Sequence, residues 1–144
     1  MPGMRFVLAG YGMPTFVEDN VISLGFVDDL AALIDSVDVA VMPITVGSGV
    51  RIKMIDYMSR GVPVVATSES LEGANCRDGI DVVVAETDEE FASAIVGLLT
   101  DRNKANYIGE NGRKYANEHF SPEVFERSMG KMIRSLFSEE PPVI

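Results

Sequence analysis

The sequence is poor in the residues that most often carry reactive or metal-binding chemistry, with one cysteine and one histidine. The lone Cys76 excludes an internal disulfide bond and suits a reducing compartment. It has no evident histidine partner, so we interpret it as an inert small residue and not as a nucleophile. His119 has no Cys, Asp or Glu at ligand spacing, which indicates a surface residue at a helix end and no metal site.

Positive charge is also scarce, because 12 basic residues face 22 acidic ones and leave a net charge of −10. Such a surface repels nucleic acid and anionic membranes, so any bound phosphate must be held by local dipoles and a few placed cations. No apolar run is long enough to span a bilayer, and Met1–Gly3 lacks the pattern of a signal peptide. We expect a cytoplasmic protein without direct membrane contact from this domain, so that any peripheral attachment to a membrane would come through another domain.

What is present is a series of short apolar runs that alternate with stretches of helical periodicity. The length of 144 residues suits one domain, and 47% apolar with 24% charged residues is a foldable balance. The predicted strands are Met4–Ala9, Val21–Leu24, Asp38–Pro43, Gly61–Ala66 and Asp81–Ala85. The predicted helices begin near Asp28, Arg51, Thr87 (in a capping box with Glu90), Arg102 and Ser121-Pro122.

Strands that alternate with helices, several of them apolar on both faces, are typical of a parallel sheet covered on both sides. The predicted fold class is therefore α/β and Rossmann-like, with one domain over residues 1–137 and a loose tail at residues 138–144. Ligands of such sheets bind beyond the carboxyl ends of the strands. The loops where we expect a site are Gly10–Pro14, Gly25–Asp29, Pro43–Gly49 and Thr67–Asn75.

The loop after the third predicted strand has the pattern best suited to phosphate binding. Gly47 and Gly49 allow the backbone to approach a ligand closely, and Ser48 adds a hydroxyl group. The N–H groups and the dipole at the start of the following helix favour an anion. Arg51 and Lys53 place two cations in the first turn of that helix. A bound diphosphate would use all of these groups.

Each of these features also has an ordinary structural explanation. The Gly-Ser-Gly segment alone is equally well explained as a flexible turn, and Arg51 and Lys53 as solvated helix charges. Its place at the carboxyl end of a strand favours the ligand site. Asp56, further along the helix, is suited to accept both ribose hydroxyls, but its spacing alone favours a surface pair with Arg60.

Several ordered motifs resemble the core signature of the retaining glycosyltransferases of the GT-B fold, family 4. That pattern is a strand and proline, a Gly-rich or acidic loop, a helix with a Glu-Ala-Met segment, and Gly-x-Pro-Val-Val. The resemblance covers the chain up to about Leu136. The matching segments are Val39–Pro43, Gly47–Lys53, Met54–Met58 and Gly61–Thr67, with Val21–Asp29, Glu72-Gly73 and Phe120-Ser121 in support.

The resemblance implies the carboxyl-terminal, donor-binding half of an enzyme that moves a sugar from a nucleoside diphosphate to an acceptor. Asp56 stands at the family's ribose-binding Glu and is one methylene shorter. Ser48 replaces a Glu that usually contacts the transferred sugar, as in the branch whose Gly-Ser-Gly amides face the donor. No metal is implied, the donor substrate is the only small molecule required, and no catalytic base or nucleophile is assigned. The expected donor-binding residues are Gly10, Gly12, Phe26, Val27, Gly47, Ser48, Gly49, Arg51, Lys53, Asp56 and Glu72.

The chain also departs from this family pattern. Met4–Gly12 resembles the second strand of the donor domain, so its opening unit and the acceptor domain are missing from the match. We expect an amino-terminal domain to complete the enzyme and the chain alone to transfer no sugar. Exposed sheet edges would favour self-association, for example as a homodimer. A noncatalytic nucleotide-binding or oligomerisation module, and half of a sugar-nucleotide epimerase, are the alternatives.

The last predicted helix carries an apolar stripe. Its simplest explanation is core packing, and the resemblance adds contact with a partner domain as a second explanation. The stripe consists of Phe125, Met129, Met132, Ile133, Leu136 and Phe137.

Overall fold

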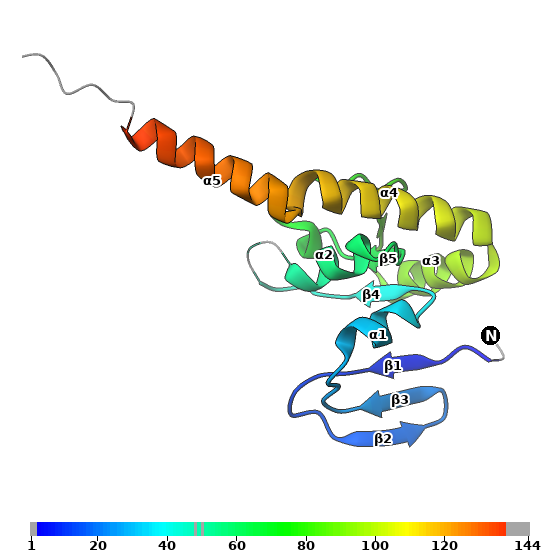
Figure 1. Cartoon of the computed structure of the whole chain (residues 1–144). Coiled ribbons are helices and arrows are strands. Elements are labelled where there is room, and N and C mark those ends of the chain that lie inside the picture. The colour runs from blue at the N-terminus through cyan, green and yellow to red at the C-terminus, as the bar shows by residue number, and fades with distance from the viewer. Residues whose placement is uncertain (1–2, 48, 50, 138–144) are drawn as a thin grey trace, which may run out of the picture. The chain divides into compact units, whose positions relative to one another are not determined.

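A computed structural model describes residues 3–47, 49 and 51–137. The chain divides into two compact units, Met1–Val37 and Asp38–Ile144, which we call the first and the second unit (Figure 1). Each unit is considered by itself. The predicted tail at residues 138–144 lies outside the described residues, and the assignment of residues 1–137 to one domain stays a prediction.

The first unit contains β1 (Phe6–Leu8), β2 (Thr15–Glu18), β3 (Val21–Leu24) and the short helix α1 (Leu30–Asp35). Its three strands follow the order β1-β3-β2. Strand β1 runs parallel to β3, with Val7 opposite Ile22. Strand β2 runs antiparallel to β3 and was not predicted from the sequence. The expectation of a wholly parallel sheet is therefore wrong for this unit.

The physical reason for the missed strand lies in β2 and its turn. All four residues of β2 are exposed, so the strand has no alternation of apolar and polar residues from which it could be predicted. The turn that follows contains Asp19, whose φ of 49° is left-handed, a conformation that Asp and Asn tolerate better than most residues. The hairpin depends on this turn chemistry and on pairing with β3, not on burial.

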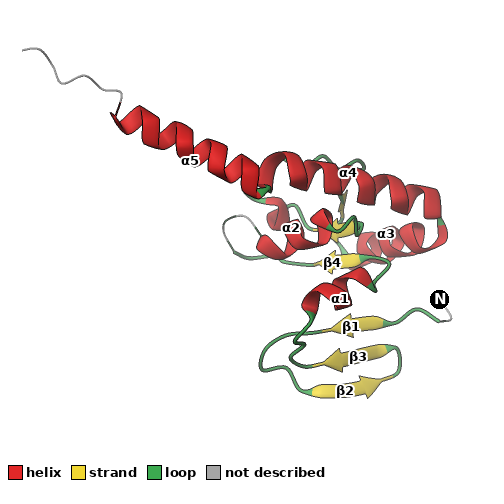
Figure 2. Ribbon diagram, viewed as in Figure 1, coloured by secondary structure: helices red, strands yellow, loops and turns green. Residues whose placement is uncertain are grey.

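The second unit contains a fully parallel sheet of three strands in the order β4-β5-β6. Its elements are β4 (Ala40–Met42), α2 (Ile52–Ser59), β5 (Val64–Ala66), the 3₁₀ turn η1 (Glu69–Leu71), β6 (Val83–Val84), α3 (Asp88–Thr100), α4 (Arg102–Phe120) and α5 (Pro122–Phe137) (Figure 2). The order and position of the predicted helices and strands are confirmed here. The α/β, Rossmann-like fold class is correct.

Two helix starts follow directly from the sequence. The hydroxyl of Thr87 accepts from the Glu90 amide at 3.2 Å, and the Glu90 carboxylate accepts from the Thr87 amide at 3.1 Å. This reciprocal capping box at α3 was predicted. Asp101 ends α3 and caps α4 by accepting from the Lys104 amide at 3.0 Å.

The core of the second unit lies between its sheet and helices α2 and α4. Met54 and Met58 of α2 are fully buried, as are Val64 and Val65 of β5. Helix α4 comes very close to the backbone after α2, because a Cβ built at Gly109 would lie 2.1 Å from the carbonyl oxygen of Gly61. Glycine is therefore required for this helix to pack where it does.

Helix α5 extends away from the body of the second unit (Figure 1). Phe125 is 65% exposed, and Met132 and Ile133 are also exposed. Core packing is thus the wrong explanation for these members of the stripe, since the helix contributes few side chains to the core. The side chains of Leu136 and Phe137 lie outside the described residues. Among the described residues, no helix is both long and apolar enough to cross a membrane.

Candidate donor-binding site

The candidate site begins where strands β4 and β5 of the second unit end. Strands β4 and β5 are parallel neighbours, and Met42 lies opposite Ala66 at their carboxyl ends. The loops after the two strands therefore emerge side by side. These are the loops predicted to bind ligand, and the second carries Thr67, Ser70 and Glu72.

The first of these loops requires its glycines. Gly47 has φ of 148° and Gly49 has φ of 85°, both disfavoured for other residues. A Cβ at Gly47 would lie 2.5 Å from one terminal nitrogen of Arg51, so the guanidinium group folds back against the loop. The Nε and Nη2 atoms of Arg51 are buried there. Ser48 and Val50 lie outside the described residues.

Glu72, which follows the 3₁₀ turn η1, contacts this loop. Its carboxylate accepts a hydrogen bond from the Gly49 amide at 3.3 Å. The Gly49 amide therefore already has an acceptor within the protein, the Glu72 carboxylate. The contact also shows that this N–H is directed toward a position where an oxyanion can sit.

Helix α2 begins directly after the loop, with Arg51 as its N-cap residue. The Arg51 side chain makes no capping hydrogen bond to this helix start. Lys53 and Asp56 are both exposed. Burial, and to a smaller extent the charge of the neighbouring Asp56, raises the pKa of Tyr57. The structure thus brings Gly47, Gly49, Arg51 and Glu72 together. Lys53 and Asp56, on the adjoining helix, present their charges to solvent.

Two polar residues of this region were missed by sequence reasoning. Ser70 is fully buried and Thr67 is 3% exposed, and both lie in the segment that follows β5. Their hydroxyls bind carbonyl oxygens at and just after the end of β4: Ser70 donates to Met42 at 2.9 Å, and Thr67 donates to Ile44. The available signal was a pair of hydroxyl residues three positions apart directly after a buried strand.

The remaining predicted residues lie in the first unit, at the carboxyl ends of β1 and β3. The Gly10 amide donates to the Gly25 carbonyl at 2.8 Å, which joins the two turns. Gly12 has a left-handed φ of 77°. Phe26 is 65% exposed and meets Tyr11 edge-on, with ring centroids 6.4 Å apart. Val27, the next predicted residue, is half-buried. Gly10, Gly12, Phe26 and Val27 thus share one edge of this unit.

The comparison with protein families decides the chain's membership. The family model described as glycosyl transferases group 1 matches residues 2–101. The chain belongs to the group 1 glycosyltransferases.

Solved structures support the same GT-B fold for this glycosyltransferase chain. Sucrose-phosphate synthase from Thermosynechococcus elongatus superposes with a TM-score of 0.80 at 24% identity, over 97% of this chain and 40% of that one. Anabaena HepE, solved in complex with UDP-glucose, gives a TM-score of 0.72 at 23% identity, over 82% of this chain and 33% of that one. An uncharacterized 44.6 kDa protein in the cps region of Klebsiella pneumoniae is 26% identical over 83% of this chain and 29% of its own length. The chain therefore spans about a third of the length of these relatives.

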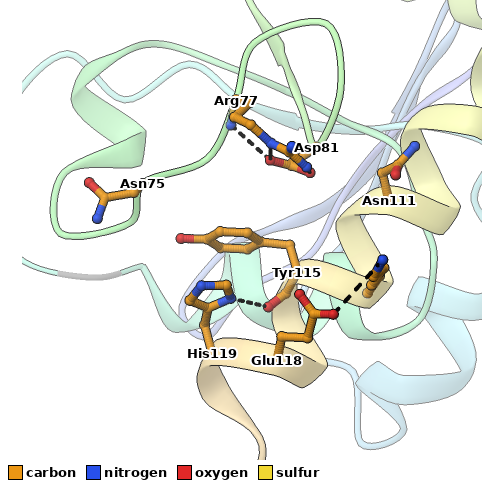
Figure 3. A pocket seen from close by; sticks show the side chains of 8 residues that line it. Asn75, Arg77, Asp81, Asn111, Tyr115, Glu118 and His119 are labelled. Atoms are coloured by element: carbon orange, nitrogen blue, oxygen red, sulfur yellow. Dashed lines mark hydrogen bonds and ion pairs between the residues drawn. The ribbon is translucent and has the colours of Figure 1, made fainter.

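The second unit also has a polar cavity of about 360 Å³ (Figure 3). None of the described residues that line it belongs to the loop between β4 and α2, which we call the glycine loop. Its charged groups pair with each other: Arg77 with Asp81 at 2.8 Å and Lys114 with Glu118 at 4.0 Å. Because these charges are already compensated, the cavity offers little for a diphosphate. The lining residues are Asn75, Arg77, Asp81, Asn111, Lys114, Tyr115, Glu118 and His119.

The two residues first considered for reactive chemistry lie beside this cavity or on its wall. His119 is exposed in the last turn of α4 and stacks on Tyr115, with ring centroids 4.2 Å apart. Within residues 3–47, 49 and 51–137, no group of three or more His, Cys, Asp or Glu is placed to hold a metal ion. Burial, as the main cause, raises the pKa of Cys76 to about 11, which keeps the thiol protonated at neutral pH.

Asp81→Asn should destabilise the chain at neutral pH, with an effect that fades in acid. The Asp81 side chain is 1% exposed and accepts from Nε and Nη2 of Arg77 at 2.9 and 2.8 Å. These hydrogen bonds lower the pKa of Asp81. A depressed pKa adds stability above the ordinary carboxyl value of about 4, which is lost as the pH falls through the folded-state value.

We expect Asp81→Asn to cost about 1–3 kcal/mol at pH 7 and markedly less near pH 3. Urea unfolding at both pH values measures the difference. The exposed control Glu110→Gln should change stability by less than about 0.5 kcal/mol. An Asp81→Asn effect of equal size at both pH values would assign it to packing instead of charge.

Proposed function

We propose that this chain is the carboxyl-terminal, donor-binding domain of a family 4-like retaining glycosyltransferase. It binds a nucleoside-diphosphate sugar for transfer to an acceptor that an amino-terminal domain holds. The observation that carries the proposal is the convergence of the Gly47 and Gly49 backbone, the Arg51 guanidinium and the Glu72 carboxylate beyond the carboxyl ends of β4 and β5. The relative HepE is described in complex with UDP-glucose, which supports the same class of donor.

The proposed chemistry is electrostatic. When the bond between the sugar and the diphosphate breaks, negative charge grows on the leaving phosphate oxygens. The Arg51 guanidinium and the start of α2 face this charge from the loop, and Lys53 adds a second cation in the first turn. These groups stabilise the transition state more than the ground state because the charge is larger there.

Donor binding requires an exchange of partners at Gly49. A phosphate oxygen takes the place of the Glu72 carboxylate as acceptor of the Gly49 amide. The released carboxylate is then available to accept from hydroxyl groups of the donor. Asp56, exposed on α2, has the role of accepting the ribose hydroxyls. No residue of this chain is assigned as a general base or nucleophile, and the donor itself is the only small molecule that the transfer requires.

The test is the affinity for UDP compared with UMP, measured by isothermal titration calorimetry. If the loop binds the diphosphate, UDP should bind with a dissociation constant of about 1 mM or below. UMP, which lacks one phosphate group, should bind roughly tenfold more weakly because it loses a charge-assisted contact. Equal affinities for the two nucleotides, or no heat with either, would contradict a diphosphate site in this loop.

A further inference from the structure

A buried polar network connects the two loops of the candidate site. The Ser70 hydroxyl donates to the Met42 carbonyl at 2.9 Å, and the Thr67 hydroxyl donates to the Ile44 carbonyl. The two hydroxyl oxygens lie 2.8 Å apart. Thr67 Oγ1 also accepts from the Ser70 amide at 3.2 Å. These atoms belong to the last residue of β4 and to the segments that follow β4 and β5.

The network depends on both hydroxyl groups. Each hydroxyl has a single proton, while three oxygen–oxygen contacts join Ile44, Thr67, Ser70 and Met42. The two protons point to the backbone carbonyls of Ile44 and Met42. The contact between the two hydroxyl oxygens therefore depends on one of these protons being shared between two acceptors. Removing either hydroxyl takes a donor from a carbonyl in the interior, and an unsatisfied buried acceptor is costly.

The network holds the glycine loop at its beginning, and Glu72 holds it near its end. Thr67 and Ser70 lie just before and within η1, whereas Glu72 follows it. The Gly49 amide contact of Glu72 is therefore the second attachment of the same loop to the same short turn. The turn is itself fixed, since the Ser68 amide donates to the Glu86 carboxylate at 2.9 Å.

We infer that Thr67 and Ser70 are positioning residues that set the geometry of the donor-binding loop. This inference rests on the proposed function, because it assigns the hydroxyls a role in holding the loop that binds the diphosphate. Burial alone does not call for hydroxyl groups at these two positions, because valine and alanine are close in size to threonine and serine and carry no polar atom that needs a partner. The hydroxyls are required by the carbonyls of Met42 and Ile44, which lie three to five residues before Gly47.

The test is Thr67→Val, which removes the hydroxyl and keeps the shape of the side chain. UDP affinity should fall about tenfold relative to wild type, while the variant stays folded. Thr67→Ser restores the hydroxyl and should recover most of the affinity. The matched control is Thr100→Val, because the Thr100 hydroxyl also donates to a backbone carbonyl, that of Val96 at 2.7 Å, but at the exposed end of α3. It should leave UDP affinity unchanged.

A second measurement separates this inference from the proposed function. In the nucleotide-free protein, the amide resonances of residues 44–47 should shift in Thr67→Val and return toward wild-type positions in Thr67→Ser. Wild-type UDP affinity retained by Thr67→Val would overturn the positioning role and leave the proposed function standing. If the wild type itself does not bind UDP, the proposed function fails, and unchanged loop resonances would overturn the positioning role separately. If Thr67→Val does not fold, Ser70→Ala carries the same expectations.

Discussion

Gly109→Ala should lower the free energy of unfolding by about 3 kcal/mol or more, the largest single-residue effect that we expect in this chain. The added Cβ would lie 2.1 Å from the Gly61 carbonyl oxygen and 3.1 Å from its carbonyl carbon. Neither atom belongs to a flexible side chain that could turn away. Helix α4 or the turn after α2 must therefore move, and both flank the buried methionines of α2.

The matched control is Gly97→Ala, in the last turn of α3. Nothing lies within 4 Å of a Cβ built there, and the residue is helical. Alanine is favoured over glycine in a helix by up to about 1 kcal/mol, so this change should stabilise the chain. Urea denaturation of both variants provides the measurement. If Gly109→Ala unfolds at the wild-type denaturant concentration, α4 is not held against Gly61 as closely as the structure shows.

Local signals in the sequence were sufficient to predict most elements of the second unit. The capping box of Thr87 and Glu90 involves neighbours in the chain, so its residues announce the start of α3 directly. The short strands β4 and β5 are nearly continuous apolar runs, as expected for strands covered on both faces. Prediction failed where structure depends on partners that are distant or exposed, as in β2, whose stability comes from its pairing with β3.

The same limit applies to the candidate site. Its location could be predicted, because the carboxyl ends of neighbouring parallel strands meet at one edge of the sheet. Its internal contacts could not. Gly49 and Glu72 are 23 positions apart, and Ser70 and Met42 are 28 apart, so nothing in the local pattern indicates that they bond. The position of the Arg51 guanidinium over Gly47 likewise depends on a left-handed turn that glycine permits but does not dictate.

The exposed apolar residues of α5 are relevant to the alternative that the chain is a noncatalytic oligomerisation module. An amphipathic helix that extends from the body of its unit is suited to contact with another domain or with another copy of the chain, as in an oligomerisation module. The glycine loop, by contrast, has no evident role in association. A nucleotide-binding measurement therefore addresses the loop without depending on what α5 contacts.

Arg51→Ala should weaken the binding of UDP about ten- to a hundredfold, equivalent to roughly 1.5–3 kcal/mol. The guanidinium lies against the loop backbone at Gly47 and keeps two nitrogens buried there. A cation already held at this position loses little conformational freedom when the diphosphate arrives, so its contact contributes more than that of a mobile surface lysine. Lys53→Ala, which removes an exposed charge two residues further along the chain, should accordingly have a smaller effect.

The control for the loss of charge is Arg102→Ala, an exposed arginine at the first residue of α4. It removes the same charge from the second unit without touching the glycine loop, so UDP affinity should stay within about twofold of wild type at physiological salt. Calorimetry on the longest form of the protein that contains this chain gives the affinities, and thermal unfolding shows whether Arg51→Ala is folded. A folded Arg51→Ala variant that binds UDP as tightly as Arg102→Ala does would remove Arg51 from the site. An equal loss in both variants would mean that the nucleotide is attracted by overall charge and not held by this loop.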